Sequence, residues 1–421
     1  MLSTLAEEFP PHTPRPAGAP LALEGVKVVD FSHFIAGPLA TMFLADLGAD
    51  VVKIEPPGRG DDLRYYPPVL PELPDQGGPF LWGNRSKRSV ALDLKNPEGL
   101  ALARALALQA DVLVENFSTG VMPRLGLGPD ELRAANPQLV YCSISAYGRE
   151  GPFADRAGFD PVVQAESGFV SMNGYPDRQG VRASAAVMDI STAMMVSNAV
   201  LAALFARQRL GHGQKVEVGL FDTGLLVTGW APMQHLLTGR APQRTGNVSV
   251  DTCPSGVFDA RDQSFYINCG NSKIFQRLMA QVLERPDIAE DPQYAQPQDR
   301  VARRDALFSV LEEAFAQQPW AHWQAKMREA GVPCGVVNTV PQAIRSPEAR
   351  ARNAVTWIAH PAVGRIPNIA SPWRFSETPV ADPKAAPRVG EHTHEVLRER
   401  LGLDEAQLAA AAAAGAFGKS P

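Results

Sequence analysis

The stretch "VKVVDFSHFIAGPLATMFLADLGADVVKIE", residues 26–55, decides the fold class. It starts with a compact β-branched run, continues with an apolar segment that ends at Gly48, and returns to a β-branched run at 49–55. A strand, a helix closed by glycine and a second strand make up the unit from which parallel sheets are built. Residues 26–55 therefore predict a β-α-β unit.

The same alternation continues to about residue 145. Strand-like runs recur at "SVALDLK" (89–95), "DVLVENF" (111–117) and "LVYCSIS" (139–145). After the first of them, Asn96 and Pro97 give the N-cap and first position of a helix. Strands this hydrophobic, alternating with helices, are typical of a parallel sheet covered on both faces. We therefore predict an α/β fold with a Rossmann-like sheet, whose ligands bind outside the carboxyl ends of the strands.

The pattern changes at about residue 229, where short antiparallel strands and then helices are indicated. We expect four parts: a flexible N-terminal arm, a large domain, a smaller α+β domain and a C-terminal segment, at 1–20, 21–228, 229–332 and 333–421.

The composition narrows the function classes. Of the 421 residues 45% are hydrophobic and 20% charged, which is the balance of a soluble globular protein. The formal net charge of −5 favours neither nucleic acid nor an anionic membrane as a partner. We see no apolar run long enough to span a membrane, and the four cysteines form no CxxC pair. We expect a cytoplasmic protein with no membrane partner.

Several common motifs are missing. A GxGxxG turn after a strand, GxxxxGK[ST], HExxH and GxSxG are all absent, which argues against dinucleotide, nucleoside triphosphate, zinc-protease and serine-hydrolase chemistry. His392 and His394 have the wrong spacing for one helix face, so we predict no metal site.

Asp189 stands out because "AAVMDISTAMM" (185–195) places it among apolar residues. An unpaired buried charge costs several kcal/mol, so such a residue is a helix cap, an ion-pair partner or a reagent. A helix is predicted from Ile190 on, which makes Asp189 a predicted N-cap. The local sequence leaves the capping and the reactive interpretations both open.

Many segments in register resemble one family. They run in order from about residue 22 to 402 and include "DFSHFIAGPLA", "NRSKRSVALDLKNPEG", "DVLVENFSTGVMPRLGLG", "GREGPFADRAGFDPV", "GHGQKVEVGLFD" and "GEHTHEVL". Together they are similar to the class III coenzyme A transferases, the CaiB/BaiF family that contains formyl-CoA transferase. The resemblance implies an interlocked homodimer in which the C-terminal segment returns to the large, CoA-binding domain.

The resemblance also implies a covalent mechanism. Asp189 would attack an acyl-CoA, giving an acyl-aspartyl anhydride and then an aspartyl-CoA thioester, from which CoA passes to a carboxylic acid. No cofactor would be permanently bound, because coenzyme A and acyl-CoA are substrates. Both intermediates hydrolyse, so the site must exclude water.

Matching family positions give the expected binding residues. Ile35 and Ala36 would lie at the thioester end, Leu92, Asp93, Leu94 and Lys95 beside the nucleotide, Asn116, Phe117 and Arg124 along the rest of the groove, with Arg59 and Arg156 as further candidates. Lys95 and Arg124 would supply cations for the phosphates.

Two departures concern the acyl group. Formyl-CoA transferase has glutamine where this chain has Ile35, and a glycine-rich loop that "VSVDTCPSGVFDARD" lacks. We therefore expect an acyl group other than formyl or oxalyl, with succinyl-CoA as a candidate donor. Arg182, Arg244 or Lys273 could pair with the second carboxylate of a dicarboxylic substrate.

Two other functions stay open. An α-methylacyl-CoA racemase shares the resemblance but needs a histidine in a GHD segment, where this chain has Phe159 in "GFD". A non-catalytic CoA-binding subunit of a hetero-oligomer would not need Asp189. Asp160, a second carboxylate before a proline, is most simply a helix cap.

Overall fold

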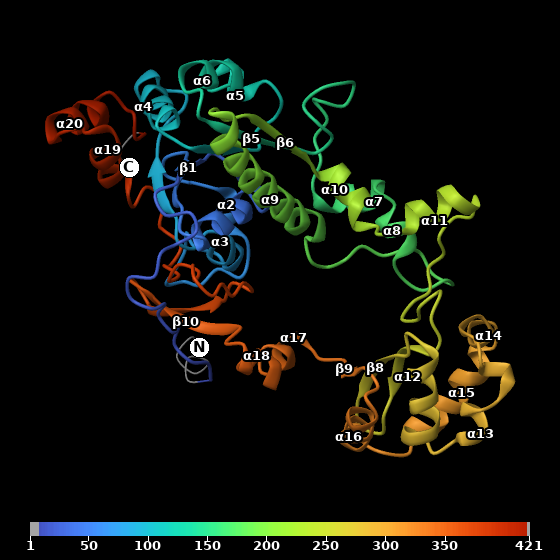
Figure 1. Ribbon diagram of the computed structural model, residues 1–421. Coiled ribbons are helices and arrows are strands. Elements are labelled where there is room, and N and C mark those ends of the chain that lie inside the picture. Colours follow the sequence, from blue (N-terminus) through green and yellow to red (C-terminus); the bar gives the residue numbers. More distant parts are fainter. Residues whose placement is uncertain (1–7, 419–421) are drawn as a thin grey trace. The chain divides into compact units, whose positions relative to one another are not determined.

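The computed structural model describes residues 8–418 (Figure 1). The first seven residues of the predicted arm and the last three of the C-terminal segment lie outside the described residues. The chain forms two compact units. The larger unit contains the chain up to Phe169, Arg182–Pro232 and the chain from Pro347, and the smaller unit contains Val170–Val181 and Met233–Ser346.

The larger unit is built on a six-stranded parallel sheet with the order β3-β2-β1-β4-β5-β6. Its strands are β1 (Lys27–Asp30), β2 (Asp50–Glu55), β3 (Arg88–Ala91), β4 (Val112–Glu115), β5 (Val140–Ser145) and β6 (Lys215–Gly219). In register, Val29 of β1 pairs with Val52 of β2 and Leu113 of β4. The predicted Rossmann-like parallel sheet is confirmed, and its strand order places β1 and β4 side by side at the point where the order reverses.

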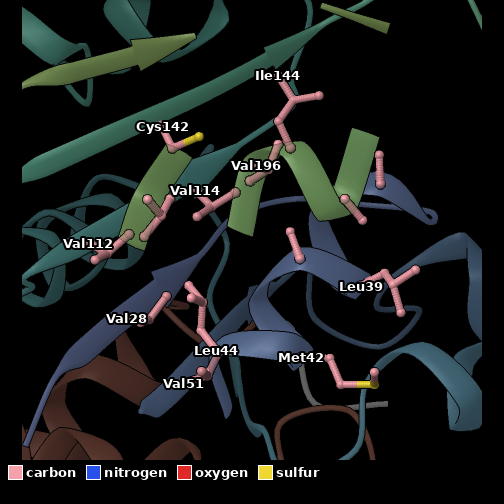
Figure 2. Close-up of a cluster of buried hydrophobic side chains, with 14 of the residues drawn as sticks. Val28, Leu39, Met42, Leu44, Val51, Val112, Val114, Cys142, Ile144 and Val196 are labelled. Carbon is pink, nitrogen blue, oxygen red and sulfur yellow. The ribbon is translucent and has the colours of Figure 1, made fainter. Parts of the chain in front are cut away.

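Alternate residues of each strand pack against different helices, because successive side chains point to opposite faces. Val28 of β1 packs with α2 (Ala36–Asp46) and α9 (Val187–Leu210), as Figure 2 shows. Val29 belongs to a second cluster with α4 (Pro97–Leu108), α19 (Thr393–Leu401) and α20 (Glu405–Ala413). Asn96 caps α4 as predicted, accepting the N–H groups of Glu98 and Gly99.

The remaining elements of this part of the chain are shorter. They are η1 (Asp62–Tyr65), α3 (Gly78–Gly83), α5 (Val121–Arg124), α6 (Pro129–Ala135), α7 (Asp160–Glu166), α10 (Leu220–Val227), α18 (Pro347–Ala351), β10 (Val355–His360) and β11 (Gly364–Ile369). Two helices, α8 (Phe169–Met172) and α11 (Ala231–Thr238), begin in the larger unit and end in the smaller one. Residues of the predicted arm lie along β10, where Pro10 and His12 exchange backbone hydrogen bonds with Trp357.

Helix α9 corrects one expectation from the sequence. By length and composition it is the one described helix that could cross a membrane. Its Val196 and Val200 are nevertheless fully buried against the cluster of α2 and the sheet. We therefore interpret α9 as the central core helix of the larger unit, with Asp189 in its first turn.

The smaller unit has a three-stranded antiparallel sheet, β7-β8-β9, as the α+β pattern predicts. Phe265 of β8 and Phe315 are fully buried at its centre. Its elements are β7 (Ser255–Asp259), β8 (Ser264–Asn268), α12 (Ser272–Arg277), the π-helical turn η2 (Leu278–Val282), α13 (Pro286–Ala289), η3 (Pro292–Tyr294), α14 (Pro297–Ala302), α15 (Arg304–Phe315), α16 (Trp320–Ala330), β9 (Cys334–Val336) and α17 (Val340–Ala343).

Candidate active site

The turn between β1 and α2 is held by side chains from neighbouring strands. The Asn116 side chain, which follows β4, accepts the His33 N–H at 2.9 Å and donates to the His33 carbonyl at 2.8 Å. Asp61 accepts the N–H of Phe34 at 3.2 Å. Phe34 has a φ of 62°, a conformation that costs a non-glycine residue energy and needs such support.

Fully buried ion pairs lie directly beneath this turn. Lys53 Nζ lies 3.0 Å from Asp61 Oδ2 and donates to the Ser32 carbonyl at 2.6 Å. Lys87 Nζ lies 2.9 Å from Asp30 Oδ2. Burial alone would raise the pKa of Asp30, but the charges of Lys87 and Lys53 outweigh it and hold that pKa well below its usual range. Asp30 therefore stays ionised, and the turn between β1 and α2 is held in place by buried ion pairs.

A pocket of about 640 Å³ opens beside the turn. Parts of its wall come from the segments that follow β1, β4 and β5, so it lies where ligands of such sheets bind. It brings together seven of the predicted residues, namely Ile35, Ala36, Arg59, Asn116, Phe117, Arg156 and Asp189.

Asp189 is the third residue of α9, and the N-cap is Ala186. The prediction that Asp189 is the N-cap is therefore wrong. Within residues 8–418 its carboxylate has no hydrogen bond or ion pair. Burial, and then the nearby charge of Asp160, raise the pKa of Asp189 to about 7. A carboxylate with that pKa is half ionised near neutral pH and is a stronger nucleophile than an ordinary one.

Asp160 supplies the cap that Ala186 lacks. Its Oδ2 accepts the N–H groups of Met188 at 2.7 Å and of Asp189 at 3.2 Å. Asp160 is the first residue of α7 and is 4% exposed. The prediction that Asp160 caps the helix that begins at Pro161 is therefore wrong: Asp160 is the first residue of that helix, α7, and it caps α9 instead.

Each arginine that lines the pocket has a carboxylate partner. Arg59 Nε lies 2.6 Å from Asp62 Oδ1, and Arg156 pairs with Glu166. Arg149, which the sequence analysis missed, pairs with Glu115 at 3.0 Å and donates to the Phe117 carbonyl at 2.6 Å. Its position just after β5, as Asn116 follows β4, is the signal that could have identified it.

Phe34, on the pocket wall, packs against two other aromatic rings. Phe34 contacts Tyr66 and Phe159 edge to face, with ring centroids 6.0 and 5.8 Å apart. Phe34 and Phe159 line the pocket together with Asp189. Phe159, which stands where the sequence resemblance would require the histidine of a racemase, is 59% exposed and presents carbon rather than an acid or base.

The other predicted residues lie outside this pocket. The Leu92 side chain is fully buried in the core, so only its backbone could face a ligand. Asp93 and Leu94 continue the turn before α4, with the Asp93 N–H donating to the Ala416 carbonyl. Lys95 and Arg124 are exposed, and in the described part of the chain neither side chain has a hydrogen bond or ion pair.

Metal and thiol chemistry find little support. Among the described residues, no three His, Cys, Asp or Glu side chains are placed to hold a metal ion. All four cysteines are free thiols. Burial raises the pKa of Cys142 to about 12, so this thiol is not a nucleophile near neutral pH.

Comparisons with known proteins agree with one another. Residues 23–393 match the model of CoA-transferase family III. The acetyl-CoA:oxalate CoA-transferase of Acetobacter aceti is 40% identical over 78% of this chain and 84% of its own. The succinate–glutarate CoA-transferase of Agrobacterium fabrum is 36% identical over 90% of this chain and 95% of its own.

Solved structures support the same conclusion. A CaiB/BaiF family protein from Brucella suis has a TM-score of 0.80 and 36% identity, over 90% of this chain and all of its own. The resemblance seen in the sequence is therefore confirmed. An enzyme class follows as well, since the matched relatives are CoA-transferases. The chain belongs to CoA-transferase family III.

Proposed function

We propose that this CoA-transferase moves coenzyme A from an acyl-CoA to a carboxylic acid with Asp189 as the covalent nucleophile. One observation carries the proposal. Asp189 is a largely buried carboxylate without a partner in the described structure, and it lines a pocket at the carboxyl ends of the strands. A structural carboxylate would be paired, because burial of an unpaired charge is costly.

The proposed steps balance without a proton or a metal. An Asp189 oxygen bonds to the acyl carbonyl carbon, and the C–S bond breaks with its electron pair on the CoA sulfur. The thiolate then attacks the aspartyl carbonyl of the anhydride, which releases the first carboxylate and leaves an aspartyl-CoA thioester. The acceptor carboxylate attacks this thioester, and the thiolate finally takes the acceptor's acyl group and frees Asp189.

We infer that at least one substrate is a dicarboxylic acid or its thioester, such as succinyl-CoA. The names of the relatives support this, since they contain oxalate, succinate and glutarate. Arg182 supports it too: it is exposed in the segment before α9, and within residues 8–418 its guanidinium bonds only the Ala183 carbonyl. Its charge is free to pair with a second carboxylate.

For coenzyme A itself, we assign the thioester end to the pocket that holds Ile35, Ala36 and Asp189. Lys95 and Arg124 are our candidates for the phosphates, because their charges are exposed and lack partners in the described structure. Arg59 and Arg156 would first have to leave Asp62 and Glu166.

We also propose a homodimer that works in the cytoplasm. In the larger unit, Leu226 of α10 is 63% exposed and Trp230, which follows α10, is 77% exposed, and large apolar side chains left to water often mark an interaction site. A second copy of this chain is the partner we assign to them. Light scattering on the purified protein tests this, and a monomer at micromolar concentration would contradict it.

The test of the transfer reaction uses succinyl-CoA with oxalate, glutarate, citramalate and acetate as acceptors, with new thioesters identified by mass spectrometry. We expect transfer to glutarate and citramalate, and a hydroxylamine-trapped adduct on Asp189 that the Asp189→Ala variant lacks. Undiminished transfer by Asp189→Ala would refute the nucleophile. Equal use of acetate would refute the dicarboxylate preference. Solvent deuterium at the α-carbon of a 2-methylacyl-CoA would instead indicate a racemase.

A further inference from the structure

The segment that leads into α9 is fixed at both ends by two side chains of α7. At one end Asp160 accepts the N–H groups of Met188 and Asp189, at 2.7 and 3.2 Å. At the other end the Gln164 side-chain oxygen accepts the Ala183 N–H at 2.8 Å. The Gln164 amide also donates to Asp160 Oδ1, which joins the two contacts into one network. We call Asp160 and Gln164 the α7 clamp.

Both side chains of the α7 clamp are buried, and Asp160 does not cap α7 itself. Gln164 is fully buried and Asp160 is 4% exposed. The Asp160 side chain gives no cap to its own helix, whose N-cap Phe159 also lacks one. Because the Asp160 carboxylate binds N–H groups of α9 and none of its own helix, it fixes the position of the α9 N-terminus.

The clamp determines what the Asp189 carboxylate can bind. A carboxylate in the first turn of a helix is normally stabilised by free N–H groups there. At α9 Asp160 already takes two of those donors, and the Asp189 carboxylate is left without a hydrogen bond among residues 8–418. A carboxylate without donors keeps its electron pairs for attack, at the cost of an unfavourable charge.

We propose that Asp160, held by Gln164, is the positioning residue of the nucleophile: it fixes the first turn of α9 and withholds that turn's N–H groups from Asp189. This inference rests on the proposed role of Asp189. It predicts that the charge and the hydrogen bonds of Asp160 act separately, the charge on the ionisation of Asp189 and the hydrogen bonds on its place.

Apart from Asp160, the charged or titratable groups near Asp189 are paired, neutral or screened by solvent, so they do not determine the ionisation of Asp189. Helices α2 and α10 present Ala36 and Leu220 to the pocket, and neither is titratable. The remaining charged or titratable groups on the pocket wall are His33, Arg59, Asp62, Arg149, Asp155 and Arg156. The three arginines are paired, Asp62 with one of them, and burial lowers the pKa of His33 so that it is neutral. Asp155 is exposed to solvent, which screens it.

The test compares Asp160→Asn, Asp160→Ala and Gln164→Ala, with Asp222→Asn as control, because Asp222 is also the third residue of its helix but is exposed. Asp160→Asn loses the charge and keeps an oxygen for the two N–H groups, while its amide nitrogen replaces the oxygen that accepts from Gln164. We expect the acidic limb of its kcat/KM profile to move down by about one pH unit or more. Asp160→Ala should lower kcat at least about tenfold across the pH range. Asp160→Asn should keep most of the wild-type kcat. The control should match the wild type.

A second measurement does not depend on turnover. Asp189→Asn removes the unfavourable charge, and its stabilising effect at pH 8 should become smaller in an Asp160→Asn background, by less than half because burial contributes more than Asp160 does. An unmoved acidic limb together with an unchanged stabilising effect would overturn the proposal. If the wild type showed no transfer at all, the proposed function would fail while this stability comparison still decided the clamp. An Asp160→Ala variant that does not fold leaves the Asn variant to decide it.

Discussion

Replacing Asp189 by asparagine should stabilise the protein while abolishing transfer. The carboxylate is largely buried and has no partner within residues 8–418, and its pKa is raised from 3.8 to about 7 by burial and by Asp160. Asparagine has nearly the same shape and is never charged. The variant therefore removes the charge without leaving a cavity.

The magnitude follows from linkage between protonation and folding. Between pH 4 and 7 the folded chain keeps a proton on Asp189 that the unfolded chain has released, so stability falls as the pH rises through this window. Each tenfold change in proton affinity is worth about 1.4 kcal/mol, which gives a total of about 4 kcal/mol. The difference between variant and wild type should be near zero at pH 4 and approach that total at pH 8.

The assay is urea unfolding at pH 4, 6 and 8, followed by circular dichroism at equal protein concentration. Asp222→Asn is the matched control, because Asp222 is the third residue of α10 and is exposed. Its effect should stay within about 0.5 kcal/mol at every pH. The reasoning is refuted if Asp189→Asn stabilises as much at pH 4 as at pH 8, or destabilises at pH 8.

Three further predictions concern the turn and the aromatic rings. Phe159→Ala should raise the ratio of acyl-CoA hydrolysis to transfer, measured as free thiol against new thioester, because it opens the pocket of Asp189 to water; an unchanged ratio would contradict this. Lys53→Met leaves Asp61 buried without its cation and should destabilise the fold by about 3–5 kcal/mol in urea, whereas exposed Lys95→Met should not. Asn116→Ala frees the backbone of His33 and should raise KM for acyl-CoA several-fold, and unchanged KM would show that the turn holds without it.

The fold was predictable because its signals are local. The β-branched runs around Val28 and Val51 and the glycine that ends the intervening helix specify a β-α-β unit without any long-range information. Hydrophobic strands then require helices on both faces, and the carboxyl ends of β1 and β4 define the ligand edge. What could not be predicted is which distant side chains meet.

The N-terminus of α9 shows why. The sequence places an acid before an apolar helix, and the simplest local interpretation makes Asp189 its cap. The cap instead comes from Asp160, 29 residues earlier in the chain. Similarly, the buried pair of Lys87 with Asp30 joins the residue before β3 to the end of β1, and their proximity depends on the order of strands. Hydrophobic periodicity predicts secondary structure but does not predict which charged residues pair, because each partner is simply a polar residue in its own segment.

The partners of the buried carboxylates are informative about function, because they show which of these charges the fold compensates. Asp30 and Asp61 are compensated by lysines, so their burial costs little beyond what the pairs return, and they hold the β1–α2 turn. Asp189 is compensated by nothing in the described structure, and Asp160 makes its charge less favourable still. The fold pairs its other buried carboxylates with cations or, at Asp160, with three hydrogen-bond donors, whereas it leaves Asp189 unpaired in a pocket and so stores free energy in that group. Conversion of Asp189 to a neutral anhydride or thioester removes the charge and releases that energy, so the resting enzyme is raised toward its covalent intermediates.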